Sequence, residues 1–117
     1  MTDTDNRLLS PQLLDARLLD KDGFLVNLDD WNPAMAAQLA QTENIQLTDA
    51  HWEILRLLRQ FHAEFDLSPA MRPLTKYIKT HLGAEQASSI YLLKLFPGSP
   101  AKIAAKIAGL PRPENCL

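Results

Sequence analysis

Apolar residues recur every three or four positions along much of the chain, as in helices with one buried face. The segment PAMAAQLAQTEN opens with Pro33 directly after Asn32, a favoured N-cap residue, and predicts a first helix. Thr48 caps a second helix, DAHWEILRLLRQFHAEF, with Leu47 and Trp52 placed as a hydrophobic staple. We expect its aligned apolar residues to be buried: Ile54, Leu58, Phe61 and Phe65.

Three further helices follow from the same spacing and from the turn residues that end them. A third helix covers residues 73–82 and ends at Gly83, because glycine readily adopts the left-handed conformation found after helices. A fourth covers about 85–96 and stops at a Pro-Gly pair. Ser99 caps a short fifth helix, PAKIAAKIA, which Gly109 closes.

The N-terminal region predicts a small β element. Residues 13–28, LLDARLLDKDGFLVNL, hold two short apolar runs around an Asp-Gly pair, which favours a hairpin or meander. The predicted fold is therefore α+β and mostly α: this hairpin packed on a bundle of about five helices, with a mobile C-terminal arm. We divide the chain into a flexible N-terminus (1–12), a single domain (13–109) and the arm (110–117).

Composition excludes few classes of function. The chain has 117 residues, 46% of them hydrophobic, and a net charge of −2, which fits one ordinary core and argues against disorder. The charges are uneven: residues 1–65 hold eleven acidic and five basic side chains, whereas 66–117 hold three acidic and seven basic, a net +4. This excess fits either solvated helix faces or a docking surface for an acidic partner protein or RNA.

The location of the protein is also constrained by the sequence. The start, MTDTDNRLLSP, lacks the features of a secretory signal, and no stretch approaches the ~18 apolar residues of a membrane span. One cysteine cannot form an internal disulfide. We therefore expect a cytoplasmic protein without membrane contacts.

The single cysteine, Cys116, is the penultimate residue and follows two prolines. Pro111 and Pro113 fix the backbone, so the segment from Leu110 is expected to leave the helical body as a semi-rigid spur. An extended chain from Pro111 to Cys116 spans at most about 20 Å, which is enough to enter a pocket of another protein.

A thiol presented in this way suits sulfur transfer, because a thiolate is nucleophilic and its persulfide can be attacked in turn. The α-carboxylate of Leu117 disfavours the thiolate, and Arg112, Lys106 or Arg72 can offset this if the arm folds back. An incidental tail cysteine is the alternative. Against it, an exposed free thiol is an oxidation liability, and here it lies on a stiffened segment.

Three stretches of the chain carry a family resemblance: DGFLVNLDDWNPAMA, then LTDAHWEILRLLRQFHAEFDLSPAMRPLTKYIK, and finally YLLKLFPGSPAKIAAKIAGLPRPENCL. In this order, with the penultimate cysteine, the chain resembles the TusE/DsrC family of sulfur-carrier proteins from about residue 18 to 117. The resemblance implies a helical body with a mobile arm, in which Cys116 is the catalytic nucleophile that carries persulfide sulfur.

The resemblance also implies partners. The DsrC branch, linked to dissimilatory sulfite reductase, has a second arm cysteine eleven positions earlier, where this chain has Ala105. The single cysteine therefore favours the TusE-like role, a sulfurtransferase that accepts sulfur from a TusBCD-type complex and delivers it to a tRNA thiouridylase for wobble 2-thiouridine. A DsrC-like role in another sulfur-oxidation or sulfite-reductase pathway is the alternative.

Other chemistry has weaker support. His51, His62 and His81 lack the spacing of metal ligands and are expected on helix surfaces. No glycine-rich loop suggests a nucleotide, so we expect neither metal nor cofactor.

A DNA-binding regulator is the alternative from another class of protein. It would have a helix-turn-helix over residues 73–96, with Arg72, Lys76 and Lys79 facing DNA phosphates. Its recognition helix, AEQASSIYLLKLF, holds one lysine and is mainly apolar, so DNA binding is not expected.

Overall fold

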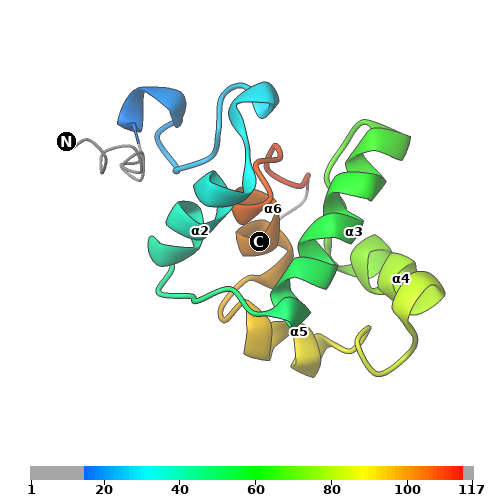
Figure 1. Cartoon of the computed structure of the whole chain (residues 1–117). Helices are drawn as coiled ribbons and strands as arrows, with labels where there is room; N and C mark the ends of the chain where they lie inside the picture. The colour runs from blue at the N-terminus through cyan, green and yellow to red at the C-terminus, as the bar shows by residue number, and fades with distance from the viewer. Residues whose placement is uncertain (1–14, 115–117) are drawn as a thin grey trace.

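The computed structural model describes residues 15–114 and contains five α-helices within them (Figure 1). The helices are α2 (Pro33–Gln41), α3 (Asp49–Phe65), α4 (Met71–Leu82), α5 (Ser89–Leu95) and α6 (Pro100–Ile107). Two 3₁₀ turns precede them, η2 (Ala16–Leu18) and η3 (Leu28–Asp30). The prediction of five helices is confirmed, whereas the flexible N-terminus assigned to residues 1–12 lies outside the described residues.

Side-chain caps explain where several helices begin. Asn32 accepts a 2.8 Å hydrogen bond from the Met35 amide at the start of α2, and Ser88 accepts one of 3.0 Å from Tyr91 at the start of α5. The Ser88 cap places the start of α5 at residue 89, later than predicted. α4 begins two residues earlier than predicted, because a proline is tolerated in a first helical turn, whose N–H groups have no intrahelical partner.

Helix α6 is the centre of the fold. It packs against α2, α3, α4 and α5, which surround it in Figure 1. Three of its eight residues are alanine, and the following residues of the helix and its C-cap are buried: Ala101, Ala104, Ala105, Ile107 and Ala108. Small side chains let neighbouring helices approach closely, so the alanine-rich helix fills the middle of the bundle.

The predicted hairpin is reduced to one antiparallel bridge, between Leu19 and Leu25, and the described residues contain no extended strand. The reason is local capping on both sides of the bridge. The side chains of Asp15 and Asn27 accept hydrogen bonds from backbone amides two residues later and hold the chain in η2 and η3. Pairing therefore ends before a strand can form.

Two expectations about α3 are corrected. Ile54, Leu58 and Phe61 are buried as predicted, but Phe65 is 49% exposed at the end of the helix. His51, expected on the surface, is buried: its Nδ1 accepts a 3.1 Å hydrogen bond from the Thr48 amide, and its Nε2 lies 2.8 Å from the carbonyl oxygen of Leu95. His51 thus completes the cap of α3 and ties it to α5.

Candidate functional site

The C-terminal end of α6 is fixed by side chains from two distant parts of the chain. The indole Nε1 of Trp31 donates a 2.9 Å hydrogen bond to the carbonyl oxygen of Ile107. Arg59 donates one of 2.5 Å to the carbonyl oxygen of Ala108, and its guanidinium lies 4.0 Å from the centre of the Trp31 ring. These donors satisfy carbonyl groups that the last turn of a helix leaves unpaired. The chain therefore leaves α6 from a fixed point.

Gly109 turns the chain away from α6. Its φ of +73° is in the left-handed region, and an added Cβ would lie 2.3 Å from Cδ1 of Trp31. The turn is closed by a 2.9 Å hydrogen bond from the Leu110 amide to the carbonyl oxygen of Ala105. Glycine is thus required both by the backbone conformation and by the close approach of the indole.

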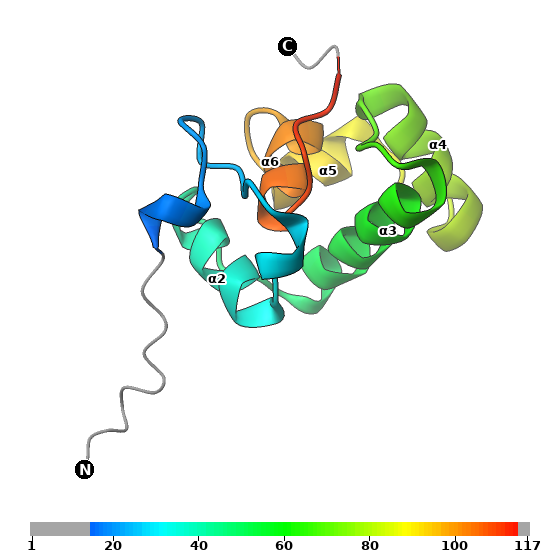
Figure 2. The same cartoon turned by 90° about the horizontal axis from the view of Figure 1, so that it is seen from above.

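We call residues 110–114 the arm base, and they lie along the body of the protein (Figure 2). Leu110 and Pro113 are buried, and the hydroxyl of Ser68 donates a 2.6 Å hydrogen bond to the carbonyl oxygen of Pro111. Arg112 forms an ion pair with Asp22 and lies 5.3 Å from the centre of the Phe24 ring. The expectation that the chain leaves the body at Leu110 is therefore wrong for the residues described.

Cys116 itself lies outside the described residues, so its role stays a prediction. Covalent geometry limits its position, because two residues after Glu114 extend the chain by at most about 7 Å. The place where the arm base ends therefore determines which surface lies near the thiol. Because Ser68 and Asp22 both hold the arm base through polar contacts, they help to set that place.

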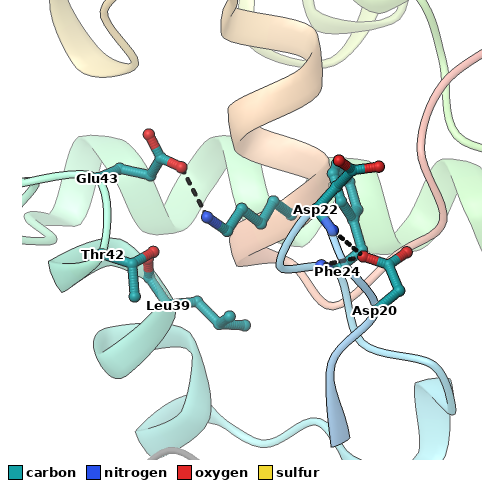
Figure 3. A network of polar contacts seen from close by, with 7 residues as sticks. Asp20, Asp22, Phe24, Leu39, Thr42 and Glu43 are labelled. Carbon is teal, nitrogen blue, oxygen red and sulfur yellow. Dashed lines mark hydrogen bonds and ion pairs between the residues drawn. The ribbon is translucent and has the colours of Figure 1, made fainter. Parts of the chain in front are cut away.

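Of the three cations predicted to support the thiolate, two already pair with carboxylates. The Lys106 ammonium lies 2.7 Å from a carboxylate oxygen of Glu43, and the lysine side chain is only 12% exposed (Figure 3). Arg112 pairs with Asp22. Arg72 is exposed near the start of α4. Within residues 15–114 no interaction joins the three to one another, so support from any of them remains a prediction.

The turn that supplies Asp22 is organised by Asp20, a residue that the sequence analysis missed. The Asp20 carboxylate accepts hydrogen bonds of 2.8 Å from the Asp22 amide and 3.0 Å from the Phe24 amide (Figure 3). These contacts, above all the one from Phe24, lower the pKa of Asp20 from its ordinary value. An aspartate opening a turn toward glycine is the signal that could have identified it.

In the part of the chain that the structure describes, no group of three or more His, Cys, Asp or Glu side chains is arranged to hold a metal ion. Among the same residues, no helix has the length and hydropathy needed to cross a bilayer.

Comparisons with known proteins point to one family. The family model described as "DsrC like protein" matches residues 15–117. The "Sulfurtransferase TusE homolog" of Haemophilus influenzae is 50% identical over 98 residues, which are 84% of this chain and 90% of that protein. The "Sulfurtransferase TusE" of Buchnera aphidicola from Acyrthosiphon pisum is 42% identical over 114 residues, covering 97% of this chain and 98% of its own.

Solved structures agree with this similarity. The NMR structure of DsrC from Allochromatium vinosum has a TM-score of 0.77 at 44% identity, over 85% of this chain and 88% of that one. The crystal structure of the oxidized gamma-subunit of the dissimilatory sulfite reductase (DsrC) from Archaeoglobus fulgidus has a TM-score of 0.73 at 38% identity. The match covers 85% of this chain and 90% of the Archaeoglobus fulgidus chain.

Proposed function

The chain belongs to the family of DsrC-like proteins, and we propose that it carries persulfide sulfur on Cys116 as a sulfurtransferase of a sulfur relay. The observation that carries the proposal is the identity of 42–50% to proteins named sulfurtransferase TusE, over a match that reaches 97% of this chain. The arm base adds physical support, because polar contacts of Pro111 and Arg112 hold this segment, which leads to Cys116, against the body.

The proposed chemistry consists of two exchanges without a net change in redox state. The Cys116 thiolate attacks the outer sulfur of a donor persulfide, the donor S–S bond breaks, and the donor leaves as a thiolate. Cys116 then carries the persulfide, whose outer sulfur is attacked by the thiolate of an acceptor cysteine. The Cys116–sulfur bond breaks and the Cys116 thiolate is regenerated, so neither exchange needs an added oxidant or reductant.

The residue at position 105 supports a carrier with one cysteine. The second arm cysteine of the DsrC branch corresponds to Ala105, which here is fully buried in α6. Without a second thiol the chain cannot close an internal disulfide over the transferred sulfur. An external thiol must therefore take the sulfur, which disfavours redox cycling with a sulfite reductase.

We further propose that the donor is a TusBCD-type complex and that the acceptor is a tRNA thiouridylase making wobble 2-thiouridine. This assignment rests on the family resemblance of the sequence, and the similarity to proteins named sulfurtransferase TusE supports it. The helix-turn-helix alternative is disfavoured by its recognition helix, because α5 has only seven residues, and Lys94 is the only basic one among them.

Intact-mass spectrometry after incubation with a persulfide donor tests the proposal. We expect an adduct of about 32 Da, the mass of one sulfur atom, on the C-terminal peptide, removable by a thiol reductant. The matched variant Cys116→Ser should fold normally, because serine is close to cysteine in size, and should gain no sulfur. A variant that still loads sulfur would exclude Cys116 as the carrier.

A further inference from the structure

A groove lies between α3 and α4, and the connection between these two helices holds the arm base through Ser68. It has a volume of about 300 Å³ and is lined by Phe61 and Phe65 from α3 and by residues of α4 that include Pro73, Tyr77 and His81. The rings contact one another in series, with centroids 4.5 Å apart for Phe61 and Phe65 and 5.0 Å apart for Phe61 and Tyr77. The groove is therefore a preformed aromatic surface.

Large apolar side chains are exposed at the arm-base end of this groove. Phe65, which lines the groove, is 49% exposed, and Leu67, which directly precedes the buried Ser68, is 47% exposed. Large aromatic side chains are the residues that most often anchor protein interfaces. Adjacent exposed apolar residues beside a groove indicate a contact surface rather than scattered exposure.

A row of cations lies along the same helix. Arg72, Lys76 and Lys79 are exposed and are spaced by four and three residues, so they share one side of α4, and Lys76 also lines the groove. α4 contains no acidic residue. Within residues 15–114 these three side chains form no ion pair or hydrogen bond, whereas Lys106 and Arg112 each pair with a carboxylate. Their charge is therefore available to an anionic partner.

This surface is close to the arm. The hydrogen bond from Ser68 to Pro111 joins the α3–α4 connection to the arm base, and both views place residues 110–114 beside that connection (Figures 1 and 2). The thiol is limited to about 7 Å of chain beyond Glu114, plus its own side chain. A protein that exchanges sulfur with Cys116 must therefore bring its own cysteine close to this part of the body.

We propose that the groove and its cationic row, here called the docking face, bind the protein that donates sulfur to Cys116. The docking face is defined by Phe65, Leu67, Arg72, Lys76 and Lys79. The partner presents an apolar side chain to the groove and Asp or Glu side chains to the cations, an arrangement that combines an anchor with charge complementarity. The inference rests on the proposed sulfur transfer and assigns it a binding surface.

A protein partner fits this surface better than single-stranded RNA does. Glu64 accepts a hydrogen bond of 3.1 Å from the Tyr77 hydroxyl at the groove, and the exposed Asp66 follows α3 directly. These carboxylates repel a continuous phosphate backbone, whereas a folded protein can place its acidic groups opposite α4 alone. The experiment below also measures RNA binding to this surface.

The test compares loading of Cys116 from two sources, a persulfidated TusBCD-type donor complex and glutathione persulfide. The first docking-face variant combines three substitutions, Phe65→Ser, Lys76→Glu and Lys79→Glu. Its matched control on α5 and α6 is Ile90→Ser with Lys94→Glu and Lys102→Glu, since these residues are also exposed. A second variant, Lys76→Glu with Lys79→Glu, leaves the aromatic contacts intact.

We expect both docking-face variants to slow loading from the protein donor by about tenfold or more and to weaken its dependence on salt. Loading from glutathione persulfide should not change, and the control variant should behave as the wild type. Unchanged loading from the protein donor would overturn the docking face, as would equal slowing from both sources. A third outcome would also overturn the proposal of a protein partner. In that outcome the wild type and the control bind a single-stranded RNA 12-mer in a salt-dependent way, and only the docking-face variants lose this binding. If the wild type loads from neither source, the proposed function itself fails.

Discussion

The indole of Trp31 donates a hydrogen bond to the carbonyl oxygen of Ile107, 76 positions later in the chain, and so fixes the end of α6. Arg59 stacks on the same indole and donates to the next carbonyl group, that of Ala108. Two side chains thus satisfy acceptors that the helix leaves open. The arm base begins at this capped end, so the path of residues 110–114 depends on residues far from them in sequence.

Replacing Trp31 by phenylalanine should lower the free energy of unfolding by about 1–2 kcal/mol more than the same change at Trp52. Trp31→Phe keeps an aromatic ring under Arg59 but leaves the Ile107 carbonyl without its donor. Trp52 is partly buried and donates no side-chain hydrogen bond within the described residues. Urea unfolding of both variants provides the comparison. Equal losses would mean that the hydrogen bond contributes nothing beyond ring volume.

Gly109→Ala should destabilise the protein more than Gly83→Ala. Both glycines have positive φ, +73° and +110°, so both substitutions strain the backbone, by about 1–3 kcal/mol. At Gly109 the new Cβ would also lie 2.3 Å from the Trp31 ring, whereas at Gly83 the nearest atom is 4.0 Å away. Thermal unfolding should therefore show the larger fall in Tm for Gly109→Ala. A similar fall in both variants would contradict the tight contact with Trp31.

The sequence predicted the parts of the fold that depend on local patterns and missed those that depend on distant partners. Helix spacing and capping residues identified all five described helices, because these signals lie within a few residues of each other. Phe65 fits the apolar period of α3, yet α3 ends there and leaves its ring half-exposed. Periodicity does not report where the packed surface stops.

The arm base is the clearest case of a missed contact. Pro111 and Pro113 suggested a projecting spur, because prolines restrict the local backbone. Whether such a segment projects or packs is decided by Ser68, 43 positions away, and by Asp22, 90 positions away. Neither residue has a local motif that points to the arm, so single-sequence reasoning could not place it.

Ser68→Ala should loosen the arm base without unfolding the body. The buried hydroxyl donates to the Pro111 carbonyl group, and its loss should cost about 1 kcal/mol, or roughly a fivefold increase in local opening. Hydrogen exchange at the Leu110 amide, which donates to the carbonyl group of Ala105 at the start of the arm base, measures this opening. Thr75→Ala is the control, because the Thr75 hydroxyl donates to a carbonyl group within α4 and does not contact the arm base. If the Leu110 amide exchanges equally fast in the two variants, Ser68 does not hold the arm base.

The turn that supplies Asp22 to the arm base should weaken in acid because of Asp20. Hydrogen bonds from the backbone, first that of Phe24, hold the pKa of Asp20 below its ordinary value. A carboxyl group whose pKa is lowered on folding contributes stability above its unfolded pKa of about 3.9, and this contribution is lost as the pH falls through the folded value. The wild type should therefore lose more stability between about pH 5 and pH 3 than Asp20→Asn does.

Urea unfolding at several pH values measures this difference, and the Phe24 amide resonance reports the turn directly. Asp29→Asn is the matched control, because its carboxylate accepts no hydrogen bond among the described residues, so it should keep the pH dependence of the wild type. The side-chain amide introduced by Asp20→Asn still offers an oxygen acceptor, so near neutral pH the turn should persist and Arg112 should keep its partner Asp22. Parallel pH profiles for the wild type and Asp20→Asn would show that the Asp20 carboxylate does not set the stability of the turn.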